Sequence, residues 1–424
     1  MAVPGIHRTI DAVWRMESAK IIAALARMVG DLELAEDLAQ DALVAALERW
    51  PKTGIPPKPA AWLMTAAKYR AIDNLRRDSM KDRKHEELGR EIEALEKSGV
   101  EGLDEELQKE VEDDLLRLIF TACHPVLSAE ARVALTLRVL GGLRTAEIAR
   151  AYLTPEKTVA QRIVRAKRTL AEARVPFEVP QGAERAARLA SVLEVIYLIF
   201  NEGYSATAGE AWVRPELCEE ALRLGRVLAE LTPDEPEVHG LAALMELQAS
   251  RLRARVDATG KPVLLMEQNR ARWDRILIQR GLDALRRAER TGKALGPYGL
   301  QAAIAAHHAR ARSSEETDWK SIAALYDALG ELTPSPIIEL NRAVAIAMAY
   351  SPEEGLEIVD ELASEPPLKE YHLLPSVRGY LLARLCRFEE AKTEFERAAA
   401  MTQNSREREL LLERARAAER GQAP

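Results

Sequence analysis

The most regular alternation of apolar and polar positions lies in the segment 143–174. At about 100° per residue, one side of a helix over 156–172 would carry Val159, Ile163, Ala166 and Leu170. The opposite side would carry Lys157, Ala160, Gln161, Val164, Arg165 and Arg168. Such a helix fits the major groove of DNA, where Gln and Arg side chains bond base edges. An ordinary amphipathic helix with a solvated basic face is the alternative.

A second, shorter helix precedes this one, so the segment reads as a helix-turn-helix. We expect Thr145 to cap the short helix TAEIARA and Tyr152 and Leu153 to form the turn. Thr154 would then cap the longer helix, with Pro155 at its first position, where its fixed φ is suitable and its missing N–H costs nothing. The pattern predicts a DNA-reading unit.

The rest of the chain also predicts helices, and its composition is typical of an all-α protein. Aromatic residues make up 5% of the chain, while Ala, Leu, Arg and Glu dominate. Strong helices are expected over 31–50 and 60–84, separated by the proline-rich break PKTGIPPKP, and a second break, VPFEVP, follows at 175–180. The predicted organisation is a helical domain at 7–90, an acidic, solvated and partly helical linker at 91–114, the helix-turn-helix domain at 115–176 and a helical domain at 181–420.

The last of these domains shows internal repetition. Gly379, Ala391 and Ala398 are spaced by 12 and then 7 residues, and Ala343 and Gly355 repeat the first spacing. These are the positions of small residues at which the two helices of a tetratricopeptide hairpin cross. Pro233 and Pro334 are 101 residues apart, close to three repeats of about 34 residues. We expect degenerate tetratricopeptide-like repeats; a generic helical bundle is the alternative.

Charge is unevenly distributed and supports a nucleic-acid partner. Residues 115–174 contain eleven Lys or Arg and four acidic residues, although the whole chain has a net charge of −7. A basic segment in an acidic protein is a footprint for phosphates. No apolar run reaches the about 18 residues that a membrane span needs, and the N-terminal residues lack the apolar core of a signal peptide. A cytoplasmic location without membrane contact is expected.

Catalytic chemistry finds no support in the sequence. There is no phosphate loop, no GxSxG and no HExxH motif, and we expect no catalytic residue, no cofactor and no metal. Cys123 and His124 resemble a metal pair but read better as a helix end, and His307 and His308 as structural residues. The segment NEGYSATAGEAW at 201–212 is expected to be a connecting loop, with a binding role as the alternative.

Two helices in the first domain carry candidate binding residues. Glu36, Asp37, Gln40 and Asp41 form a polar patch on a helix whose other side is apolar, and a merely solvated face is the alternative. The next helix interleaves rings and cations, a pattern that suits unpaired bases and phosphates: Trp62, Lys68, Tyr69, Arg70, Arg76 and Arg77. A surface helix with one core tryptophan explains the second pattern equally well.

Taken in order, these segments resemble a bacterial RNA polymerase sigma factor of the extracytoplasmic-function type, in a subgroup with a tetratricopeptide-like extension. AEDLAQDALVAALERW resembles region 2.2, PAAWLMTAAKYRAIDNLRR regions 2.3 and 2.4, and 127–170 region 4; YLIFNEGYSATAG and LNRAVAIAM resemble the extension. The resemblance implies that core polymerase contacts Asp37, Leu38, Gln40 and Asp41. It also implies that the −10 element contacts Trp62, Tyr69, Arg70, Arg76 and Arg77, and the −35 element Lys157, Gln161, Arg165 and Arg168, with Arg162 on a phosphate.

Two departures from the family pattern limit what it implies about promoter sequence. Tyr69 stands where many members have Asn, and Ala160 where many have Lys or Arg. A helix-turn-helix regulator with a tetratricopeptide sensor, and a pure scaffold, remain the alternatives, although neither needs a polymerase-binding helix followed by a DNA-melting one. The C-terminal domain would modulate activity, either by hiding the polymerase-binding face or by holding the DNA-binding regions productively, and its groove suits a partner protein or peptide.

Overall fold

The chain is helical throughout the part that the structure describes. The computed structural model describes residues 3–78, 103–206 and 212–422, without the side chains of 3–4, 76–78 and 103–108. No strand occurs within these ranges, and the one β-bridge joins Val256 and Pro262. The expected all-α fold is confirmed. The chain divides into two compact units, Met1–Ile196 and Tyr197–Pro424.

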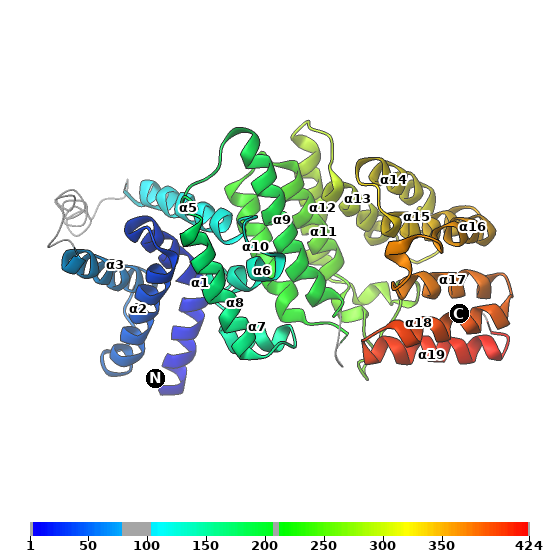
Figure 1. Ribbon diagram of the computed structural model, residues 1–424, viewed down its shortest axis with the longest axis horizontal. Helices are drawn as coiled ribbons and strands as arrows, with labels where there is room; N and C mark the ends of the chain where they lie inside the picture. Colours follow the sequence, from blue (N-terminus) through cyan, green and yellow to red (C-terminus); the bar gives the residue numbers. More distant parts are fainter. Residues whose placement is uncertain (1–2, 79–102, 207–211, 423–424) are drawn as a thin grey trace. The chain divides into compact units, whose positions relative to one another are not determined.

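Unit 1 contains the two helical segments expected at 31–50 and 60–84 and the helix-turn-helix. Asp31 caps α2, because its carboxylate accepts a hydrogen bond of 2.9 Å from the N–H of Leu34. Beyond Asp78 the second segment lies outside the described residues. The helices of this unit, with the one that crosses its boundary (Figure 1), are α1 (Val3–Val29), α2 (Leu32–Thr53), α3 (Pro59–Asp78), α5 (Leu103–Ala122), α6 (Ala129–Val139), α7 (Thr145–Ala151), α8 (Glu156–Glu172) and α9 (Gly182–Tyr204).

The helix-turn-helix forms as expected, but its caps differ from the prediction. Thr145 is the first residue of α7, and the carboxylate of Glu147 accepts the N–H of Arg144 at 2.8 Å. Pro155 is the N-cap of α8, and the hydroxyl of Thr154 donates back to the carbonyl of Tyr152. Leu153 has a φ of +48°, so the turn bends through the left-handed region. Both helices therefore begin without the threonine caps that the sequence suggests.

The predicted acidic linker is in part a structural helix. Helix α5 begins at Leu103 and continues across the expected domain boundary at 114. Asp114 is buried, and its carboxylate accepts hydrogen bonds from Arg27 of α1 at 2.9 Å and Arg117 at 2.7 Å. The linker is thus packed against α1 at Asp114, while Lys109, Glu110, Glu112 and Asp113 are exposed. Residues 91–102 lie outside the described part.

The C-terminal domain was expected to begin at 181, but the division between units falls inside α9. The first half of α9 belongs to unit 1, where Arg188 donates to the carbonyl of Phe120 at 3.0 Å and Ser191 to that of Cys123 at 2.6 Å. Helix α9 also extends to Tyr204, so the loop expected at 201–212 begins later than predicted.

Unit 2 consists of helix pairs that cross on small residues. A Cβ on Gly355 would lie 2.7 Å from the carbonyl oxygen of Ala343, and one on Gly379 would lie 3.2 Å from that of Ala391. These are the positions that the tetratricopeptide spacing singled out. The α-helices of this unit are α10 (Pro215–Leu231), α11 (Pro236–Ala249), α12 (Arg275–Arg290), α13 (Pro297–Arg310), α14 (Trp319–Leu332), α15 (Pro336–Ala349), α16 (Pro352–Leu362), α17 (Leu373–Arg384), α18 (Phe388–Met401) and α19 (Ser405–Glu419).

One inference from the repeat length was wrong. The 101 residues between Pro233 and Pro334 hold two helix pairs, α11–α12 and α13–α14, instead of three repeats. The excess length is the irregular segment 250–274, which contains the short 3-10 helices η2 (Leu252–Ala254), η3 (Leu265–Glu267) and η4 (Arg270–Arg272). A further 3-10 turn, η5 (Pro366–Leu368), joins α16 to α17.

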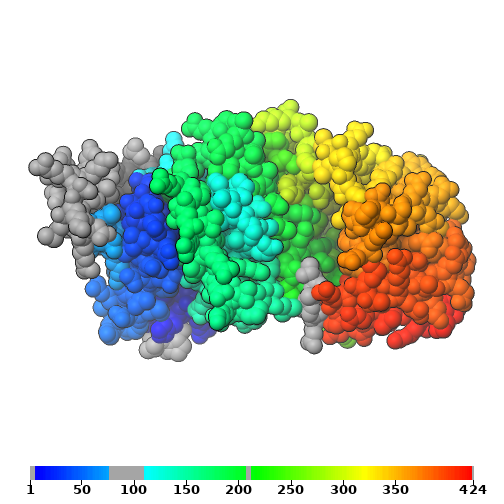
Figure 2. Space-filling view, viewed as in Figure 1, coloured from blue at the N-terminus to red at the C-terminus, as the bar shows by residue number. Residues whose placement is uncertain are grey.

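The last helix of unit 2 returns to this irregular segment. Glu413 and Arg414 of α19 form ion pairs with Lys261 and Glu267, the second at 3.6 Å. Asn404, next to the start of α19, donates to the carbonyl of Ala206 at 3.1 Å. Figure 2 shows the orange and red surfaces of α17, α18 and α19 in close packing. None of the described helices is long and apolar enough to cross a lipid bilayer.

Candidate functional site

Helix α8 presents the predicted DNA-reading face to solvent. Val159, Ile163, Ala166 and Leu170 are buried, as the apolar stripe predicts. The side chains expected to read the −35 element are all exposed: Lys157, Gln161, Arg165 and Arg168. Arg168 forms an ion pair of 2.7 Å with Glu172, whereas no ion pair is recorded for Lys157 or Arg165 within the described residues. Arg162 is half-buried at the side of this face.

Helix α3 divides its predicted −10 residues between core and solvent. The ring of Trp62 packs edge-on against buried Trp50, with centroids 5.4 Å apart. Tyr69 is 44% exposed, and Arg70 donates to the carbonyl of Ala66, one turn earlier. Trp62 therefore packs against the core, and Tyr69 is the exposed aromatic ring of α3. The side chains of Arg76 and Arg77 lie outside the described part.

The predicted polymerase-binding residues on α2 do not share one exposed face. Asp37 and Asp41 are exposed, but Leu38 is buried with the apolar stripe of α2. Gln40 is half-buried, and its amide donates to Glu36 at 2.8 Å. In this conformation Leu38 is a core residue, which corrects the expectation that it faces the polymerase. The exposed acidic surface that remains is Asp37 and Asp41.

The predicted exposure of Glu36 was wrong. It was expected in a solvated patch, but it is 4% exposed. Its carboxylate forms one ion pair with Arg138 of α6 at 2.5 Å and another with Lys167 of α8. Glu36 and Lys167 each lie at the border of an apolar stripe in their own helix, which is the only signal in the sequence for this contact. We call these three residues the Glu36 triad.

The electrostatics of the Glu36 triad favour the charged carboxylate. Burial raises the pKa of Glu36, but Lys167 and Arg138 outweigh it, so the pKa lies below the ordinary value. A lowered folded-state pKa contributes stability above the ordinary pKa of a glutamate, and this contribution is lost only as the pH falls through the lowered value. At neutral pH Glu36 is therefore ionised, and its ion pairs tie α2 to α6 and α8.

A small cleft lies beside the triad, between the first two helices and the helix-turn-helix. Its volume is about 170 Å³, and Glu36 and Gln40 line it together with Arg15, Arg144 and Glu147. Two exposed ion pairs bridge its rim, Arg15 with Glu147 at 3.1 Å and Arg144 with Asp11 at 3.5 Å. Much of the charge of the basic segment is thus engaged within unit 1, and Lys157, Arg162 and Arg165, for which the described residues record no ion pair, lie on α8.

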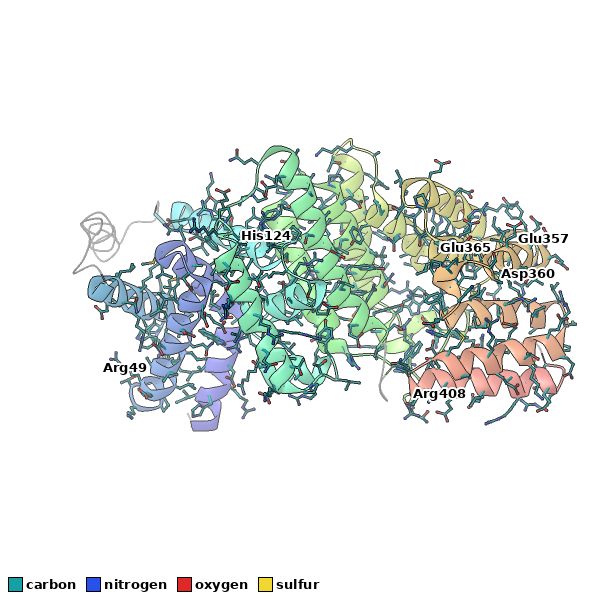
Figure 3. The ribbon with its side chains drawn as sticks, in the orientation of Figure 1. Arg49, His124, Glu357, Asp360, Glu365 and Arg408 are labelled. Atoms are coloured by element: carbon teal, nitrogen blue, oxygen red, sulfur yellow. The ribbon has the colours of Figure 1, made fainter. Side chains whose placement is uncertain are left out.

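Cys123 and His124 lie at the end of a helix and make local contacts. Cys123 and His124 directly follow α5, and the ring of His124 (Figure 3) accepts the N–H of Val126 through Nδ1. Burial raises the pKa of the Cys123 thiol to about 11. Across the residues described, no three His, Cys, Asp or Glu side chains are grouped so as to hold a metal ion.

Three family models match successive segments of the chain. Residues 14–80 match the model of sigma-70 region 2, and residues 117–170 match that of sigma-70 region 4. Residues 188–289 match a family of unknown function, DUF6596. The first match contains most of α1 together with α2 and α3, and the second contains α6, α7 and most of α8.

Relatives cover both the whole chain and its first half. An uncharacterized protein of Rhizobium meliloti is 45% identical over 399 residues, 94% of this chain and 93% of its own. A probable ECF RNA polymerase sigma factor, SigI, of Mycobacterium tuberculosis is 26% identical over 179 residues, 42% of this chain and 60% of its own. No solved structure matches the chain. Regions 2 and 4, in the order and on the helices described, show that the protein belongs to the sigma-70 family, as a sigma factor of the extracytoplasmic-function type.

Proposed function

We propose that the protein binds core RNA polymerase through α2 and directs it to promoters whose −35 element is read by α8. The observation that carries this is the exposed face of α8, where Lys157, Gln161 and Arg165 stand together opposite a buried stripe. Their donors suit guanine and adenine edges in the major groove. The chain itself would catalyse no reaction; it would act as the dissociable specificity subunit of the polymerase.

The first prediction concerns polymerase binding. Reversing the charge of exposed Asp37 and Asp41 to Lys should leave helicity unchanged, because neither side chain packs in the core. It should weaken the capture of core polymerase at least tenfold, since each acid would meet a cation on the polymerase. A pull-down with purified core enzyme measures this. Glu33→Lys, also exposed on α2, is the matched control, and equal recovery of polymerase by all three proteins would disprove the assignment.

A second prediction separates base reading from phosphate binding on α8. Arg165→Ala should relax the preference at one or two −35 base pairs by about 1–3 kcal/mol each. Half-buried Arg162, at the side of the reading face, should contribute affinity alone. Arg162→Ala should therefore weaken all promoters alike and lower the salt slope by about one unit. Selection from a promoter library with reconstituted holoenzyme gives both profiles, and a wild-type profile for Arg165→Ala would count against base reading by α8.

The geometry of unit 1 supports a further element of the proposal, an opening step. The −10 and −35 elements lie about 25 base pairs apart, which is about 85 Å at 3.4 Å per step. The path from Tyr69 through Trp62, Trp50 and the Glu36 triad to Gln161 runs about 40 Å along helices at 1.5 Å per residue. Two crossings between packed helices add about 10 Å each, so the whole path is about 60 Å long. Because this path is an upper limit on the separation, both elements can be bound only after regions 2 and 4 move apart.

The third prediction tests this opening. Glu36→Gln keeps the shape of the side chain but removes the charge that Arg138 and Lys167 neutralise. Regions 2 and 4 should then separate more readily, which should increase the radius of gyration in small-angle scattering and raise the affinity for core polymerase several-fold. Lys167→Gln should act in the same direction from the other side of the contact. Glu33→Gln serves as the control. Wild-type dimensions and affinity in both folded variants would contradict the opening step.

We further propose that unit 2 modulates this core by holding it in a productive arrangement. The segment between α8 and α9 is short, and the first half of α9 packs within unit 1, so any contact made by unit 2 acts at a roughly millimolar effective concentration. A partner protein or peptide bound to the helix pairs would then be able to alter promoter use.

The fourth prediction follows from this arrangement. A chain that ends after Tyr204 keeps all of α9 but lacks the helix pairs, and it should give several-fold less run-off transcript than the full chain. A chain that ends at Pro180 would also lose the α9 contacts to Phe120 and Cys123, so it serves as the control for damage to unit 1. Higher activity of the Tyr204 chain would show that unit 2 is inhibitory, and equal activity would remove the proposed role.

A further inference from the structure

Unit 2 carries a basic block of its own that the proposed function does not use. Residues 250–293 contain twelve Lys or Arg and five acidic residues, in a chain whose net charge is −7. This excess equals the excess in the helix-turn-helix segment. The block comprises the irregular segment after α11 and the whole of α12.

Helix α12 concentrates this charge on one side. At 100° per residue, its buried residues Ile278, Gly281, Ala284, Leu285 and Ala288 face unit 2. The remaining arc, about 180° wide, carries five arginines and one exposed acid: Arg275, Ile276, Gln279, Arg280, Arg286, Arg287, Glu289 and Arg290, with half-buried Asp283 in its middle. On this arc Ile276 is the one large apolar side chain. The outer face of α12 is therefore a cationic stripe about 24 Å long, at 1.5 Å per residue.

Most of these guanidinium groups are not neutralised. Arg286 forms an ion pair with Asp283. For Arg275, Arg280, Arg287 and Arg290, the described part of the chain records no ion pair. By contrast, Arg378 of α17 is neutralised by Asp360 of α16 (Figure 3), with which it forms an ion pair of 2.7 Å. An unneutralised row of arginines is complementary to a polyanion.

The turn before α12 extends the stripe with a hollow. Arg253, Arg272 and Arg275 line an open depression of about 490 Å³, whose wall includes Trp273 and Ile276. The turn is held firmly, because Trp273 is buried and the guanidinium groups of Arg251 and Arg270 lie 5.7 and 5.1 Å from its ring centre. The exposed arginines are thus presented from an ordered surface, which lowers the entropy cost of binding.

We propose that this surface, made of Arg253, Arg272, Arg275, Arg280, Arg287 and Arg290, binds the phosphate backbone of duplex DNA. Arginine is suited to phosphate because its planar fork donates two parallel hydrogen bonds. A protein partner would be expected to bury an apolar centre inside a polar rim, and the exposed arc of α12 lacks such a centre. The inference goes beyond the proposed sigma function, since it needs neither polymerase nor a promoter sequence.

The test compares salt dependence in the full chain. Anisotropy of a fluorescein-labelled 40-base-pair duplex of mixed sequence is measured between 50 and 200 mM NaCl. Arg280→Ala combined with Arg287→Ala should reduce the salt slope by about two units and the affinity about tenfold at 0.1 M salt. The matched control replaces Arg416 of α19 and Arg420, the residue that caps its C-terminus, both of which are exposed; it should behave as wild type. Lysine at positions 280 and 287 should retain most of the slope.

The outcomes separate this inference from the proposed function. An unchanged slope in the folded α12 variant, or an equal loss in the α19 control, would overturn the DNA surface. Core polymerase capture is measured on the same proteins and should be unaffected. Loss of polymerase capture with unchanged DNA binding would assign the stripe to a protein partner and also overturn the inference. Failure of wild-type capture would instead count against the sigma function and leave the DNA result standing.

Discussion

The arrangement of unit 1 depends on one buried carboxylate. Glu36 is nearly inaccessible and is neutralised from two different helices, by Arg138 and Lys167. A charge in such a place is tolerated only while it is paired, and removing a partner costs several kcal/mol. The triad therefore couples the packing of α2, in region 2, to that of α6 and α8, in region 4. It stabilises a compact free state while leaving Asp37, Asp41 and the outer face of α8 in solvent.

Residues with a local periodicity were predictable, and residues with distant partners were not. The stripe of Val159, Ile163, Ala166 and Leu170 fixes which face of α8 is buried, and its exposed face follows from that stripe alone. Glu36 lies at the border of the apolar stripe of α2, and contacts with residues more than a hundred positions away make it a core residue. The continuation of α9 across the unit boundary has a similar cause, because its first half is held by carbonyls at the end of α5.

In unit 2 the repeat spacing predicts helix crossings but not the segment that interrupts them. Positions 355 and 379 require glycine because a Cβ at either position would press against a backbone carbonyl of the paired helix. The irregular segment 250–274 has no such spacing of small residues. Contacts between aromatic rings and arginine side chains hold it in place instead. Arg251 donates to the hydroxyl of Tyr204 at 2.5 Å, and burial, with the nearby Arg251 and Arg270, lowers the pKa of His308 to about 3. His308 is therefore neutral at physiological pH, which avoids a further charge among these arginines.

The charge pattern of the whole chain limits where a polyanion can bind. Two segments, 115–174 and 250–293, carry a large excess of basic residues, although the chain as a whole has a net charge of −7. Taken together, the residues outside them carry an excess of acidic side chains, although the sequence around α3 holds a smaller basic cluster. In the first segment several arginines are held by internal acids such as Glu36 and Asp114, whereas on α12 most point to solvent. Within the described residues, the second segment therefore exposes the larger share of cations without a recorded ion pair, even though the first contains the helix-turn-helix.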